Sequence, residues 1–92
     1  MKTILNKKVT LLDKEATYAE LLSACNNVAP DKGWTPQEQK KALRVDTAIE
    51  KAGDTIELED ADFEYIKPKV SAMPWAIKDK VLVEFTDYIE GL

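Results

Sequence analysis

The sequence predicts an α+β fold, in which about four helices pack on a small two- or three-stranded antiparallel sheet. Three observations support this prediction. Apolar residues recur at helical spacing in several segments, threonine-led capping motifs precede two of those segments, and residues 55–59 alternate between apolar and polar. With 92 residues, of which 45% are apolar and 33% are charged, we expect one globular domain over residues 1–92 with a modest core.

The N-terminal region has two short apolar runs, Ile4-Leu5 and residues 9–12, which are separated by three polar residues. They predict one or two short strands, or a hairpin. Residues 55–59, which follow Gly53-Asp54, predict a further, half-buried strand. We therefore expect the N-terminal strands and residues 55–58 to form the sheet.

Two threonine motifs predict where the first helices begin. Thr17 is followed three residues later by a glutamate, as in a capping box, and Thr35 is followed by both Pro36 and a glutamate at the third helical position. The first helix should end at Asn26-Asn27, with Leu21, Leu22, Ala24 and Cys25 on its apolar side. The second should span residues 36–52, because Gly53 stands where a left-handed C-terminal cap belongs. Its apolar side carries Ala42, Val45, Ile49 and Ala52.

Two further helices are predicted in the C-terminal third. Asp60 should cap the first of them, whose apolar stripe consists of Phe63, Ile66, Val70 and Met73. Pro68 lies inside this pattern, so we expect the helix either to kink there or to end near Lys67. Residues 77–89 fit a helical face better than a strand through residues 81–83.

Together these patterns predict a core of ten apolar side chains that coincide with the helix and strand periods. They are Leu21, Val45, Ile49, Ile56, Leu58, Phe63, Ile66, Val81, Phe85 and Ile89.

The composition argues against most catalytic and metal sites. The chain has no histidine, which is the commonest general base near neutral pH and the commonest metal ligand. Its one cysteine, Cys25, cannot form a thiolate zinc cage, an iron–sulfur site or an internal disulfide. Because Cys25 falls on an apolar helix side, we interpret it as a small buried hydrophobe. We therefore expect no enzyme, no metal and no cofactor.

The strongest compositional anomaly is an acidic run. Residues 46–64 contain eight carboxylates and one cation, which gives a local charge of −7. Most of these residues are explained as solvent-facing strand residues, caps or first-turn acids. If a protein partner is engaged electrostatically, the predicted surface consists of Glu57, Glu59, Asp62 and Glu64.

A basic stripe gives the alternative. Lys40, Arg44 and Lys51 share one side of the predicted helix over residues 36–52 and could contact nucleic-acid phosphates. An ordinary solvated helix face explains them as well, since carboxylates stand on the adjacent side. Trp34 and Trp75 both lie at junctions between elements, where core packing is the favoured interpretation and an interface anchor is the alternative.

Residues 34–90 also show a pattern that resembles small proteins encoded in phages and prophages of Gram-negative bacteria. It consists of Trp34-Thr35-Pro36-Gln37-Glu38, Ala42-Leu43-Arg44, Asp46, Ile49-Glu50, residues 56–63, Met73-Pro74-Trp75 and Phe85. Such proteins mostly have no assigned activity, so no functional residues carry over. The resemblance implies a stoichiometric phage product rather than a metabolic enzyme.

The sequence thus predicts a non-enzymatic protein that acts by binding another protein, either as a virion assembly factor or as an inhibitor of a host system, including anti-CRISPR-type inhibitors. The alternative is a small nucleic-acid-binding module that uses the basic stripe. The sequence shows neither a membrane-spanning segment nor a signal peptide, and one free cysteine fits a reducing compartment. We expect a cytoplasmic protein of the bacterial host cell, with no membrane partner.

Overall fold

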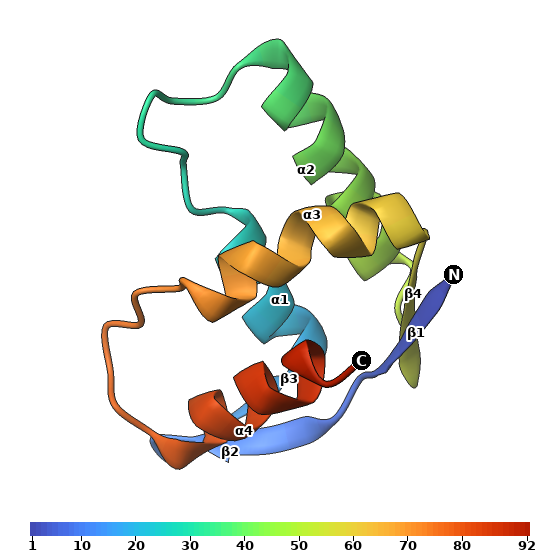
Figure 1. Cartoon of the computed structure of the whole chain (residues 1–92). Coiled ribbons are helices and arrows are strands. Elements are labelled where there is room, and N and C mark those ends of the chain that lie inside the picture. Colours follow the sequence, from blue (N-terminus) through green and yellow to red (C-terminus); the bar gives the residue numbers. More distant parts are fainter.

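The computed structural model describes all 92 residues and has four helices and two separate two-stranded antiparallel sheets, which confirms the α+β class (Figure 1). The elements follow the order β1 (Lys2–Leu5), β2 (Lys8–Leu11), β3 (Lys14–Thr17), α1 (Tyr18–Asn26), α2 (Pro36–Glu50), β4 (Thr55–Leu58), α3 (Asp60–Ser71) and α4 (Lys80–Glu90).

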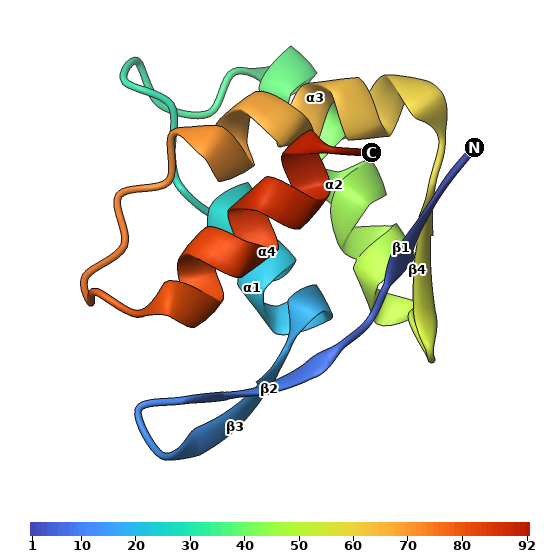
Figure 2. The same ribbon diagram turned by 60° about the horizontal axis from the view of Figure 1, so that its bottom comes forward.

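We expected the N-terminal strands and residues 55–58 to form one sheet, but the strands form two separate pairs. β1 pairs with β4, with Ile4 opposite Ile56, so that the N-terminus and the middle of the chain meet as expected. β2 instead pairs with β3, a strand that the sequence did not indicate because residues 14–17 are mostly polar. The resulting β2–β3 hairpin lies at the bottom of Figure 2, where β2 contacts α4 and β3 contacts α1.

The turn of this hairpin has residues that are not typical of a hairpin turn, so it was not predicted. Leu11 pairs with Lys14, so the connection has two residues, and both Leu12 and Asp13 have positive φ values of 49° and 65°. This is the backbone of a type I′ turn, in which glycine or asparagine is favoured because other side chains are strained there. Leu12-Asp13 is an unusual pair for such a turn.

Both threonine caps are present where the sequence predicted them. The backbone N–H of Glu20 donates to Thr17 Oγ1 at 3.2 Å, and that of Glu38 donates to Thr35 Oγ1 at 3.2 Å. Two other predicted caps are wrong. Gly53 does not adopt a left-handed conformation, since α2 ends at Glu50 with Lys51 as its C-cap in a right-handed conformation. The N-cap of α3 is Glu59, while Asp60 is already helical.

The α3 helix continues through Pro68 to Ser71 and neither ends near Lys67 nor restarts. Met73 therefore lies beyond the helix, although its side chain still packs against the core. The fourth helix is shorter at its start than predicted, because Asp79 caps it by accepting from the backbone N–H of Val81.

The core lies around α1, which contacts α2, α3 and β3 and which α3 crosses in Figure 1. Eight of the ten predicted core residues are buried, and Ile49 and Val81 are half-buried. Sequence reasoning missed Ile4 and Tyr18, both of which are buried. The ring of Tyr18 packs edge-on against Phe85 with the centroids 4.9 Å apart, and this contact ties α1 to α4.

Candidate functional site

The predicted acidic surface and the predicted basic stripe lie on one mixed face. This face contains a shallow hollow of about 270 Å³. One side is lined by Arg44, Thr47 and Ala48 of α2 and by its C-cap residue Lys51, and the other by Glu57, Glu59 and Asp62 from β4 to the start of α3. Cations and carboxylates therefore alternate across it. Neither a purely acidic patch nor a purely basic stripe is present there, because α2 packs against the β4–α3 junction.

Two of these residues are already paired with each other. Arg44 Nε donates to Asp62 Oδ1 at 2.9 Å, and Asp62 is only 6% exposed. Glu64 is exposed outside this hollow, and Lys40 lines a separate depression one turn earlier on α2. Of the predicted sets, the fold brings Glu57, Glu59 and Lys51 together as exposed charges, next to the exposed Arg44, which is paired with Asp62.

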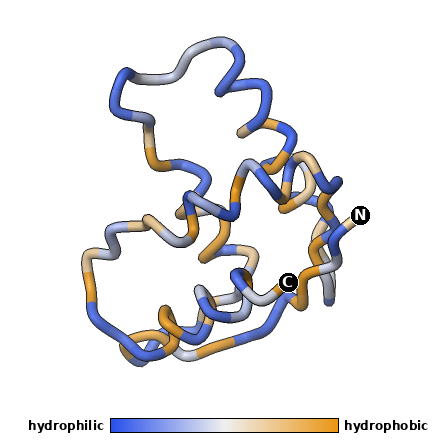
Figure 3. Tube along the Cα trace, viewed as in Figure 1, coloured by the Kyte–Doolittle hydropathy of each residue, from blue (hydrophilic) through white to orange (hydrophobic).

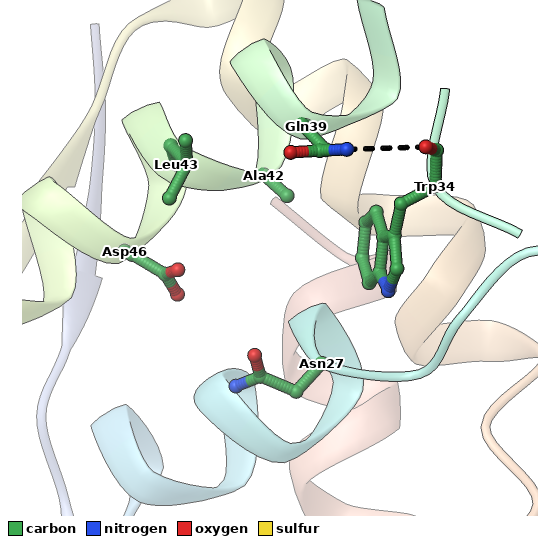
Figure 4. A pocket seen from close by; sticks show the side chains of 6 residues that line it. All are labelled: Asn27, Trp34, Gln39, Ala42, Leu43 and Asp46. Carbon is green, nitrogen blue, oxygen red and sulfur yellow. Dashed lines mark hydrogen bonds between the residues drawn. The ribbon is translucent and has the colours of Figure 1, made fainter. Parts of the chain in front are cut away.

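A different concave site lies between the C-terminal end of α1 and the first half of α2. We call it the α1–α2 hollow and define it by its six lining residues, which enclose about 320 Å³: Asn27, Trp34, Gln39, Ala42, Leu43 and Asp46. In Figure 4 the Trp34 indole forms one wall, while Leu43 and Asp46 stand opposite. The surrounding chain is largely hydrophilic (Figure 3).

The loop between α1 and α2 holds Trp34 in this position. A turn is closed by the backbone N–H of Gly33, which donates to Pro30 O at 2.8 Å, and Gly33 has a φ of 80° that favours glycine. Immediately afterwards Thr35 caps α2, and Gln39 Nε2 donates to the Trp34 carbonyl oxygen at 3.1 Å (Figure 4). Trp34 is half-buried and does not join the core, whereas Trp75 packs against it.

Beneath the hollow, α1 and α2 are joined by one buried side-chain amide. Asn26 is fully buried, and its Nδ2 donates both to the Ala42 carbonyl oxygen at 2.9 Å and to Asp46 Oδ1 at 2.8 Å. Asn26 Oδ1 has no partner. Asp46 is therefore held by a fixed donor from below and presents its second oxygen to the hollow.

Two exposed apolar side chains mark different surfaces of the molecule. Leu43, at the α1–α2 hollow, is 60% exposed, and Val83, on the outer side of α4, is 59% exposed. Val83 lines a second hollow of about 300 Å³ with Trp75, Ile77 and Leu82. Isolated exposed apolar residues are common on protein surfaces, but Leu43 stands beside a half-buried tryptophan at a concave site.

Two observations bear on the chemistry of these sites. No three thiol or carboxylate groups converge in a way that could hold a metal ion. Cys25 is fully buried, and burial raises the pKa of its thiol to about 12, so it is not a reactive thiolate near neutral pH. Burial, followed by a hydrogen bond to Glu38, raises the pKa of Tyr65 to about 12 as well.

Of the residues that line the α1–α2 hollow, only Trp34 was considered as an interface anchor, with core packing favoured, whereas Ala42 was assigned to the apolar helix side and Asp46 to the acidic run. Gln39, Leu43 and Asp46 follow helical spacing along α2, but Asn27 and Trp34 lie outside that helix and share no period with it. The available clue was that Trp34 lies in a loop while Leu43 sits off the apolar side of α2. Their convergence depends on how the loop closes over the helix.

Comparison with protein-family models, curated proteins and solved structures gives no match for the chain. None of the four helices combines the length and the apolar character that crossing a membrane requires.

Proposed function

We propose that this chain is a non-enzymatic protein whose role is to bind another protein, and that the α1–α2 hollow is the centre of the contact. The observation that carries the proposal is the pairing of a half-buried tryptophan with a 60%-exposed leucine across a concave site rimmed by polar groups. Tryptophan is among the residues most enriched at the energetic centres of interfaces, and polar rims surround such centres.

The resemblance of residues 34–90 to phage and prophage proteins supports a choice of partners. We propose a virion component, for which the chain would be an assembly factor, or a component of a host system that the chain inhibits, such as a CRISPR effector. Both kinds of partner are present in a phage-infected bacterial cell, which is therefore the source of lysate for the test.

The test compares three forms of the protein in pull-down experiments from lysates of uninfected and phage-infected bacteria. Wild type should retain a protein in a stoichiometric amount, and Leu43→Ser should lose it, because the change removes the apolar contact from an exposed helical position. Val83→Ser is the matched control, since its side chain is equally exposed on α4. Retention by Leu43→Ser, or loss by Val83→Ser alone, would overturn the assignment of the surface.

The nucleic-acid alternative uses Lys40, Arg44 and Lys51 and is less well supported by the charge distribution. Arg44 is paired with Asp62, and Lys51 shares its hollow with Glu57 and Glu59. Binding through phosphate contacts weakens steeply with salt. Absence of binding to single-stranded and duplex nucleic acid at low salt would eliminate this alternative.

A further inference from the structure

We propose that the α1–α2 hollow receives an arginine side chain of the protein partner. This inference rests on the proposed function and adds the chemical identity of the group that enters the site. Its basis is that the Asp46 carboxylate and the oxygens of two lining amides are left as acceptors next to one aromatic wall, while the only N–H donors left without an acceptor are one of Gln39 Nε2 and that of the Trp34 indole.

The polarity of the hollow follows from which atoms are already bonded. Asn27 Nδ2 donates to the Ser23 carbonyl oxygen at 2.7 Å, and Gln39 Nε2 donates to the Trp34 carbonyl oxygen at 3.1 Å. A carbonyl oxygen can only accept, so both amides are fixed with their oxygens on the other side. Asp46 Oδ1 is occupied by Asn26 Nδ2, which leaves Oδ2.

Three acceptor oxygens therefore remain around the hollow: Asn27 Oδ1, Gln39 Oε1 and Asp46 Oδ2. In Figure 4 the oxygens of Asp46 and Asn27 point into the space beside the Trp34 ring. A ligand that fits must supply several donors at once. A negatively charged group is disfavoured, because it would face the Asp46 carboxylate and none of the six lining residues is a cation; the nearest cation is Lys69, over the Trp34 ring.

The Trp34 ring favours a flat cation. Lys69 Nζ lies 5.5 Å from the centroid of this ring, which shows that the ring is placed to interact with a cation, although the Lys69 charge itself opposes a second one. A guanidinium group is planar, stacks on aromatic rings and carries five N–H donors, whereas an ammonium group is compact and has three. Arginine thus matches both the flat wall and the spread of acceptors. The net charge of −4 also favours approach of a basic partner.

The first experiment titrates the ¹⁵N-labelled protein with N-acetyl-arginine amide and follows the indole N–H signals by NMR. The chain has two tryptophans, so Trp75 provides an internal control signal in the same spectrum. We expect saturable shifts of the Trp34 indole and of the Asn27 and Gln39 side-chain amides, with Trp75 unchanged. The matching citrulline amide, which is neutral and nearly isosteric, should not bind, and the lysine amide should bind more weakly.

Two variants change the charge of the site in opposite directions, and a third serves as a control. Asp46→Asn should weaken binding of the arginine amide roughly tenfold or more, since a charge-assisted hydrogen bond is lost. Lys69→Gln should tighten it by roughly twofold, because a like charge next to the ring is removed. Glu50→Gln, with the same charge change one turn further along α2 on an exposed position, is the control for Asp46→Asn.

Several outcomes would overturn the inference. These are equal shifts with citrulline amide, equal or tighter binding of lysine amide, equal shifts of Trp75, or an equal effect of Glu50→Gln. This experiment contains no lysate, so its result does not depend on finding the partner. If Leu43→Ser releases a captured partner while Asp46→Asn does not, the arginine assignment fails and the proposed function remains.

Discussion

Cys25 and Asn26 are sequence neighbours that illustrate two kinds of buried residue. Both are fully buried in α1. Cys25 lies among apolar side chains as a neutral thiol, and burial is the main cause that raises its pKa from 9.0 to about 12. Asn26 faces α2 and is fixed by two acceptors, so that it connects the core to the α1–α2 hollow. Apolar packing stabilises Cys25 in its position, whereas hydrogen bonds to two acceptors fix the orientation of Asn26.

The raised pKa of Cys25 predicts a loss of stability in alkali. The unfolded chain ionises its thiol from about pH 9, whereas the folded chain resists ionisation up to about pH 12. The contribution of the neutral thiol is therefore complete below pH 9 and is lost as the pH rises toward 12, at a rate of at most about 1.4 kcal/mol per pH unit. Urea unfolding from pH 8 to 11 should show a steeper decline for wild type than for Cys25→Ala. Parallel declines would contradict this prediction.

At the scale of the elements, local sequence decides where each helix begins more firmly than where it ends. Thr17, Thr35 and Asp79 each accept a backbone N–H near the start of their helix. The helix ends differ: Asn27 Nδ2 donates to the Ser23 carbonyl oxygen at the end of α1, as the predicted end there requires, whereas α2 ends at Glu50 and Gly53 misled its prediction. Two elements carry visible local conflicts: the β2–β3 turn has Leu12 in a left-handed conformation, and α3 contains Pro68.

We expect Leu12→Asn to stabilise the protein by about 0.5–1 kcal/mol, because asparagine tolerates the left-handed backbone of the type I′ turn and leucine does not. The free energy of unfolding in urea measures the change. Leu5→Asn is the matched control, since Leu5 is similarly exposed but lies in β1 and has no positive φ. If both variants shift stability equally, the strain at Leu12 is not the cause.

Pro68→Ala should also stabilise the protein, by about 1–2 kcal/mol. Proline lacks the N–H that would donate to the Glu64 carbonyl oxygen and crowds that group, although alanine gives the unfolded chain somewhat more freedom. The same substitution at Pro36 is the control, because the first helical position tolerates proline. Pro36→Ala should give no gain. A gain there of similar size would show that the position inside α3 is irrelevant.

At the scale of the whole molecule, one charged pair links α2 to α3. Arg44 Nε and Asp62 Oδ1 are 2.9 Å apart, and the residues are 18 positions apart in sequence. The Asp62 side chain is 9% exposed, while that of Arg44 is 58% exposed. The exposed Arg44 therefore neutralises the buried Asp62 carboxylate. The main contribution of the pair to stability is that Asp62 is not left as an unpaired buried charge.

Arg44→Gln should consequently destabilise the protein by about 1–2 kcal/mol, since Asp62 would be left buried without its cation while water and the exposed rim screen part of the loss. Lys40→Gln, one turn earlier on α2 and exposed, should change stability by less than about 0.5 kcal/mol. Thermal and urea unfolding of both variants provide the comparison. Equal effects would indicate that only the net charge of α2 matters.

Much of the fold could be predicted, and little of the site. The four helices, the strand at residues 55–58 and most of the core follow from hydrophobic period and capping residues, as Val45 and Phe85 show. Glu57, Glu59 and Arg44 were each identified as charged surface residues, but their arrangement on one mixed face was not. The α1–α2 hollow was missed, because Asn27, Gln39 and Asp46 have no periodic relation to Trp34.

The sequence by itself determined the class of the fold, the capped starts of α1 and α2 and most of the buried side chains, since these depend on side-chain periods and caps that act within a few residues. The tertiary structure alone decided that β1 pairs with β4 while β2 pairs with β3, that Arg44 meets Asp62, and that Trp34 closes a hollow with α2. Strand pairing and contacts between helices join residues far apart in the chain. They are set by how all the apolar faces pack at once, which no local pattern specifies.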